Sequence, residues 1–232
     1  MFLSTKMSRL RQRLLQHHLP LLAFSFASVA LLYFTRPYKD WVTRASFATA
    51  YPALILLATT LLIGPWNLLR RRRNPISSDL RRDLGIWAGF LSVMHATVGQ
   101  FVHLRGRPWL YYVYGATERH HGMPIRHDVF GLSNFTGLLA VFMILMLLAT
   151  SNDFSLRALK AARWKTLQRW SYVAFVLVAI HTFGYQMGIE KQDWRFVALA
   201  AAGVALAITF QVIGIVRARS AAVKGEPVRQ TS

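Results

Sequence analysis

Six long apolar runs, separated by short basic segments, constrain this chain more than any other feature. Each approaches or reaches the length of about 20 residues with which a helix crosses a hydrocarbon core of about 30 Å. The runs lie at Leu19–Phe34, Ala45–Gly64, Leu84–Leu104, Val129–Ala149, Trp170–Met187 and Phe196–Val216. Hydrophobic residues make up 54% of the chain, and its mean hydropathy is +0.31. We therefore predict an all-α, multi-pass protein of the cell membrane, folded as a six-helix transmembrane bundle.

This pattern divides the chain into three parts. We predict a basic cytoplasmic N-terminus over residues 1–18, the transmembrane domain over 19–216, and a polar cytoplasmic tail over 217–232. His17 and His18 are expected at the membrane interface. The first run is the shortest, and its basic flank and small residues also fit a cleavable signal peptide, which would leave five spans.

The basic residues indicate how the bundle is oriented. The net charge is +19, and most of the 28 Lys and Arg residues fall before the first run, after the second, after the fourth and after the sixth. Since cytoplasmic loops are enriched in Lys and Arg, both termini are predicted to be cytoplasmic. The charges cluster between apolar runs and not on one face, so we expect membrane lipid and no nucleic acid as a partner. The basic loop Arg157–Arg169 either contacts lipid headgroups or docks an acidic protein or a flavin phosphate.

Two histidines lie deep inside apolar runs, His95 in SVMHATVG and His181 in VAIHTFG. Each is 11 residues after the start of its run, at Leu84 or Trp170, and so roughly 16 Å from the inner boundary. Both runs are predicted to point outward, so the two imidazoles can face each other near the middle of the bilayer. Small residues on the same helix faces would make room for a flat macrocycle: Ser92, Gly99 and Gly184.

A haem held between two imidazoles fits this pattern. The chain has no cysteine, which excludes thiolate ligands and covalent haem attachment and leaves b-type haem. Two alternatives remain open on spacing alone. The histidines could bond to neighbouring backbone while the glycines serve helix packing, or they could titrate in a proton relay.

Three segments together resemble the ferric reductase-like transmembrane family. This family includes the membrane part of NADPH oxidases and the haem subunit of the periplasmic methionine sulfoxide reductase system. The segments are RRDLGIWAGFLSVMH (81–95), FTGLLAVFMILMLLATSN (135–152) and RWKTLQRWSYVAFVLVAIH (163–181). The resemblance is strongest over residues 81–187, about half of the chain.

The resemblance implies a haem b protein that passes electrons across the membrane, as a component of an oxidoreductase. His95 and His181 match two of the family's axial ligands. The family commonly has a further histidine thirteen residues before the second of them, where this chain has Gln168, so one haem is expected and a second is doubtful. The donor would be a separate flavoprotein reductase, a bound FMN or FAD, or a quinone in its reduced form. The acceptor outside would be ferric iron or a periplasmic redox partner.

The loop between the third and fourth runs holds further candidate ligands. His103 or His127 could bind a second haem or another metal near the outer face, although such mixed loops are usually only solvated. The other candidates in this loop are Glu118, His120, His121 and Asp128. Two other functions are kept beside electron transfer. These are a proton-coupled transporter that titrates His95 and His181, and a non-catalytic membrane scaffold.

Overall fold

The computed structural model describes residues 10–70, 75–104, 107–115, 124–189 and 194–223. Its helices are α2 (Leu19–Thr35), α3 (Trp41–Leu69), α4 (Pro75–Gly99), α5 (Val129–Ala149), α6 (Asp153–Gln168), α7 (Trp170–Phe183) and α8 (Trp194–Val223). Short turns complete them: η1 (Leu14–His18) before α2, η2 (Pro108–Tyr111) between α4 and α5, and η3 (Gly184–Ile189) after α7. The only β-pairing among the described residues is a single bridge, Val113–Ile125. The all-α prediction is confirmed.

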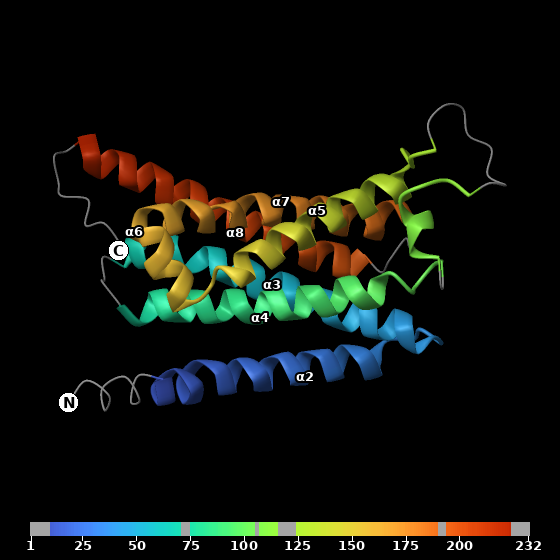
Figure 1. Ribbon diagram of the computed structural model, residues 1–232, viewed down its shortest axis with the longest axis horizontal. Coiled ribbons are helices and arrows are strands. Elements are labelled where there is room, and N and C mark those ends of the chain that lie inside the picture. Colours follow the sequence, from blue (N-terminus) through green and yellow to red (C-terminus); the bar gives the residue numbers. More distant parts are fainter. Residues whose placement is uncertain (1–9, 71–74, 105–106, 116–123, 190–193, 224–232) are drawn as a thin grey trace.

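Within the part of the chain that the structure describes, five helical segments are long and apolar enough to cross a membrane. They are Leu10–Thr35, Trp41–Asn67, Val129–Ala149, Asp153–Ile189 and Trp194–Arg217. The sixth helix of the bundle, α4, runs alongside them (Figure 1). Its first turns carry charged residues and its helix ends at Gly99, not at the predicted Leu104, which shortens its apolar part. The chain is a multi-pass membrane protein, as predicted.

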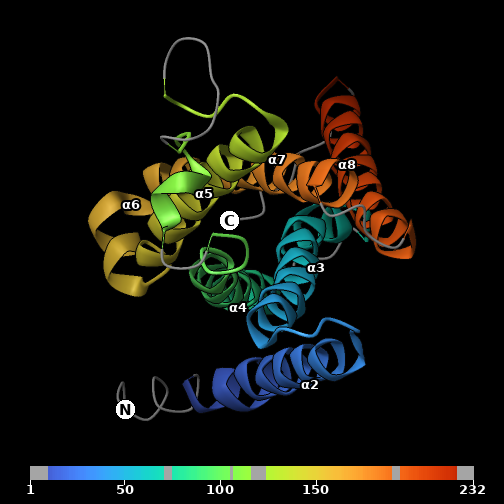
Figure 2. The same ribbon diagram turned by 90° about the vertical axis from the view of Figure 1, so that its right-hand side faces the viewer.

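The central helix of the bundle is α3. It packs most extensively against α4 and also contacts α2 and α8, while α5 packs mainly against α7. Figure 2 shows α3, α4, α5 and α7 around the middle, with α2 and α8 at the periphery. The N-terminal end of α2 and the C-terminal end of α8 lie at the same end of the bundle (Figure 1). This agrees with an even number of membrane crossings. That this end of the bundle faces the cytoplasm stays a prediction.

Helix α5 begins and ends where the sequence predicts. The carboxylate of Asp128 caps its first turn by accepting a hydrogen bond of 2.7 Å from the Gly131 backbone N–H.

The segment expected to be a cytoplasmic loop, Arg157–Arg169, is largely helical and belongs to α6. Asn152 caps this helix by accepting a hydrogen bond of 2.8 Å from the Ser155 N–H. The helix-favouring sequence LRALKAAR then continues it, with a break at Lys160, where φ is 60°.

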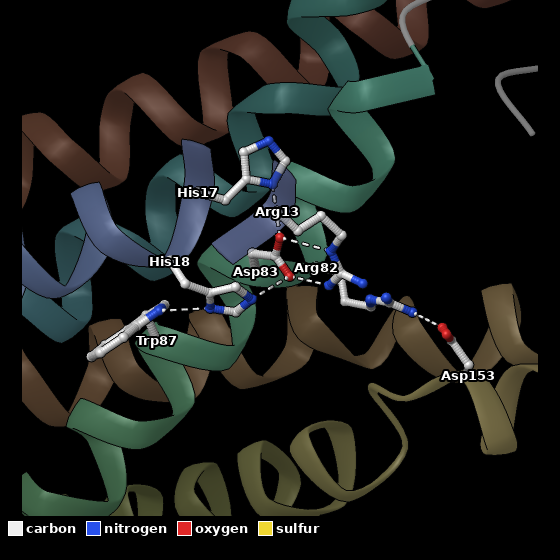
Figure 3. Close-up of polar contacts among 7 residues, drawn as sticks. All are labelled: Arg13, His17, His18, Arg82, Asp83, Trp87 and Asp153. Atoms are coloured by element: carbon white, nitrogen blue, oxygen red, sulfur yellow. Dashed lines mark hydrogen bonds and ion pairs between the residues drawn. The ribbon is translucent and has the colours of Figure 1, made fainter. Parts of the chain in front are cut away.

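A buried carboxylate ties the N-terminal helix to α4 (Figure 3). The Asp83 side chain is 0% exposed and accepts hydrogen bonds from both ends of the Arg13 guanidinium, Nε at 3.3 Å and Nη2. His17 Nδ1 lies 2.8 Å from its Oδ2 and His18 Nε2 lies 3.4 Å from its Oδ1. Trp87 donates to His18 Nδ1 at 3.2 Å, which puts the His18 proton on Nε2, facing the carboxylate. His17 and His18 therefore serve an internal ionic cluster and not merely the membrane interface.

Candidate functional site

A cavity opens between α3, α4, α5 and α7, and both of the intramembrane histidines line it. Helix α4 supplies His95 and α7 supplies His181. The walls on either side of the pair come from α3 and α5, through small and apolar residues such as Ala50, Ala53 and Val141. This arrangement leaves space beside the two rings in the middle of the bundle.

Each imidazole is oriented by a backbone carbonyl of the neighbouring helix. His95 Nδ1 lies 2.9 Å from the Ser46 carbonyl oxygen on α3, and His181 Nδ1 lies 2.7 Å from the Ser133 carbonyl oxygen on α5. Because a carbonyl oxygen only accepts hydrogen bonds, each Nδ1 carries the proton and donates it. The lone pair of each ring is then on Nε2, the state in which histidine binds a metal.

The two rings lie side by side at a spacing that a shared metal ion would give. Their centroids are 6.1 Å apart and their planes are inclined by 74°. Two imidazoles on opposite sides of one metal, with metal–nitrogen distances of about 2 Å, have centroids about 6 Å apart. The spacing and the two imidazole donors therefore fit an iron held between His95 and His181.

The small residues named from the sequence lie in two different places. Ser92 and Gly99 line the cavity. Gly184, the first residue of η3, lies against α5, where an added Cβ would be 2.1 Å from Ser133 Oγ. Gly137, which the sequence reasoning did not select, lies directly against the His181 ring, since a Cβ there would be 2.5 Å from His181 Nδ1.

The two weaker histidine candidates have different ring neighbours. His103 lines the cavity and stacks on Tyr185, with ring centroids 5.9 Å apart and planes inclined by 28°. His127 is exposed and contacts Tyr114, with centroids 5.5 Å apart. Glu118, His120 and His121 lie outside the described residues. Among the described residues, no group of three or more His, Cys, Asp or Glu side chains is placed to hold a metal ion.

Gln168, at the position of the family's additional ligand, lies at the end of α6. Its side-chain amide donates to the Thr150 hydroxyl at 3.3 Å, beside the Trp164 indole, which donates to the Thr150 carbonyl at 2.8 Å. Gln168 thus connects the end of α6 to the end of α5.

Two residues of the site were missed by the sequence reasoning, Ser46 and Ser133. Both begin a Ser-x-x-Thr sequence, SFAT and SNFT, and in both the Ser carbonyl also accepts a bond from the Thr hydroxyl three residues on, at 3.0 Å for Thr49 and 2.9 Å for Thr136. This repeated pattern on α3 and α5 is the signal that could have pointed to the carbonyl partners of the two histidines.

The fold and the site define a class, a multi-pass membrane protein with a facing pair of histidines inside a helical bundle. No family model matches the chain. Curated relatives do match it. The chain is 31% identical over 199 residues to the "Protein-methionine-sulfoxide reductase heme-binding subunit MsrQ" of Deinococcus radiodurans, over 82% of this chain and 81% of the relative. It is 28% identical to the subunits of the same name from Salmonella paratyphi B and Salmonella newport, over 72% of this chain and 76% of each relative. The chain belongs to the MsrQ family, and the resemblance stated from its sequence is confirmed.

Proposed function

We propose that this chain binds one b-type haem between His95 and His181 and carries electrons across the membrane for a methionine sulfoxide reductase. The observation that carries the proposal is the arrangement of the His95 and His181 rings. Its rings are 6.1 Å apart, and both Nδ1 protons are directed to carbonyl oxygens. The printed names of the relatives, which call them heme-binding subunits of that reductase, support the same assignment.

The haem would supply the one-electron redox chemistry. The chain's own residues would do the rest. The carbonyls of Ser46 and Ser133 hold the two imidazoles in one tautomer and at a fixed tilt, so that little reorganisation is needed when the charge on the site changes. Apolar side chains of α3 and α5 exclude water from the site. The exposed apolar side chains of α2, such as Phe26 and Leu31, would face lipid.

We place the electron donor at the end of the bundle that carries the two described chain ends, on the cytoplasmic side. A separate flavoprotein, a bound FMN or FAD, or a quinol could each serve there. The acceptor on the opposite side would be the periplasmic catalytic partner of the reductase. We prefer this partner to ferric iron because the relatives are named as reductase subunits.

The test is a dithionite-reduced minus oxidised absorption spectrum of the purified protein. We expect a low-spin b-type signal in the wild type, and its loss or conversion to high spin in His95→Ala and in His181→Ala. His127→Ala is the matched control, because this exposed histidine lies outside the cavity, and it should leave the spectrum unchanged. A colourless wild-type preparation from haem-replete cells would refute the proposal. A normal spectrum in both ligand variants would refute the ligand assignment.

A further inference from the structure

The cavity around the histidine pair is polar at one end and apolar at the other. The apolar end, toward the start of α4, is lined by Leu54, Leu57, Ala140, Val141, Ile144 and Val178. The polar end, toward η2, is lined by Thr43, Gln100, Tyr112, Asn134, Tyr185 and Gln186. No Lys, Arg, Asp or Glu is among the described residues that line either end. A ligand that fills the whole cavity would therefore have one apolar edge and one edge rich in hydrogen-bonding groups.

Gln186 at the polar end has a buried polar atom that the protein leaves unsatisfied. Gln186 is only 6% exposed and lies in the π-helical segment η3, which continues α7. The amide nitrogen donates to the Tyr51 hydroxyl, whereas Oε1 has no hydrogen-bond partner among the described residues. A buried amide in this state costs free energy unless a ligand supplies the missing bond.

The Gln186 amide can also donate to an anionic ligand if it is rotated by about 180°, so that its oxygen and nitrogen exchange places. A phenol both donates and accepts, so the Tyr51 hydroxyl can donate to Oε1 while the Gln186 nitrogen donates into the cavity. A carboxylate, which only accepts, then satisfies Gln186. A second neutral donor group is near, since the Gln100 amide and the Tyr112 hydroxyl face each other at 3.2 Å.

A cationic side chain, Arg36, packs against an aromatic residue of the cavity wall. The Arg36 guanidinium carbon lies 4.0 Å from the ring centroid of Phe196 and 5.3 Å from that of Phe47, which is part of the cavity wall. Arg36 Nε is itself buried without a hydrogen-bond partner among the described residues. A cation in this position favours a negatively charged group at the polar end over a neutral one.

We infer that the polar end of the cavity binds the two carboxylate groups of the haem, with Gln186 as a positioning residue that fixes which edge of the ring points toward η2. The inference rests on the proposed haem function and adds the orientation of the ring, with the vinyl-bearing edge among the apolar residues around Leu57 and Ile144.

The test compares two forms of the cofactor. The protein is produced without haem, purified in detergent, and titrated with protohaem or with its dimethyl ester, while the low-spin absorption band reports binding. The ester keeps the iron and the ring but cannot place a charged carboxylate at the polar end. We expect wild-type protein to bind the free acid at least about tenfold more tightly than the ester, the magnitude of a hydrogen bond to a charged group.

Two variants then locate the effect. Gln186→Leu should weaken binding of the free acid and leave the ester nearly unchanged, so that the ratio of the two affinities falls toward one. Val141→Ala, at the apolar end, should change both affinities by the same factor. Comparing ratios between variants cancels the different partitioning of the two haems into detergent.

Three results would count against the inference. Equal wild-type affinity for the two forms would overturn it without any variant, and so would a Gln186→Leu protein that loses affinity for both forms alike. A wild-type protein that binds neither form would overturn the proposed function itself, which keeps the two failures distinguishable.

Discussion

Replacement of Asp83 by Asn tests what holds the N-terminal helix on the bundle. The wild-type carboxylate is fully buried and receives both ends of Arg13 together with His17 and His18. The Asn side chain keeps the shape of Asp83 but carries no charge. The Arg13 guanidinium, whose side chain is 17% exposed, is then left without its counter-ion. Breaking a buried ion pair by removing one partner costs about 3–5 kcal/mol. For a chain of this size that corresponds to a fall in the melting temperature of roughly 6–20 °C.

The assay is thermal unfolding in detergent, followed by tryptophan fluorescence. Asp153→Asn is the matched control, because it makes the same chemical change in a neighbouring but exposed ion pair. Asp153 bonds Arg82 at 2.6 Å, but its side chain is 62% exposed, so its loss should cost less than about 1 kcal/mol. Equal stability of Asp83→Asn and wild type, or an equal loss in the two variants, would refute the view that Asp83 anchors this helix.

The remaining predictions concern pH and two glycines. Burial by itself raises the pKa of the Asp83 carboxyl, but the hydrogen bonds from Arg13 and His17 outweigh it and lower the pKa overall. Its contribution to stability is therefore present above the ordinary Asp pKa and lost as pH falls through the lowered value, and Asp83→Asn should remove this part of the acid-side decline. Gly137→Ala should displace His181 and weaken the low-spin haem signal, whereas Gly203→Ala, with no atom within 4 Å of the new Cβ, should not. Gly184→Ala should lower the melting temperature through its clash with Ser133 Oγ, and the double variant with Ser133→Ala should recover most of the loss, so an unrescued double variant would contradict the contact.

The sequence predicts the spans well because membrane-crossing helices depend on long apolar runs, which can be read one segment at a time. The run at Val129–Ala149 coincides with α5 at both ends. The limits of α4 were predicted less well, because polar turns carry the helix from Pro75 to the start of the apolar run at Leu84, and it ends at Gly99. Asp83 can be buried at the beginning of the apolar run only because Arg13, about 70 positions earlier, reaches it.

The candidate site, like the fold, could be predicted from the sequence only in part. The histidines stand out in the sequence because an imidazole in an apolar run is rare, and their depth follows from the helical rise. Their carbonyl partners could not be identified from one helix alone, since any backbone oxygen can accept a hydrogen bond. Which of them does so depends on how α3 packs on α4 and α5 on α7. The burial of the Gln186 amide is likewise visible only in the folded structure, because its sequence neighbours give no sign of it.

The central claim is that His95 and His181 bind one haem iron from its two sides. Near-infrared magnetic circular dichroism of the oxidised wild-type protein tests it most directly, together with the haem content per chain. The charge-transfer band of a low-spin ferric haem reports the identity of both axial ligands. We predict the band of two neutral imidazoles and one haem per chain. A band that requires any other axial ligand, or two haems per chain, would contradict the claim.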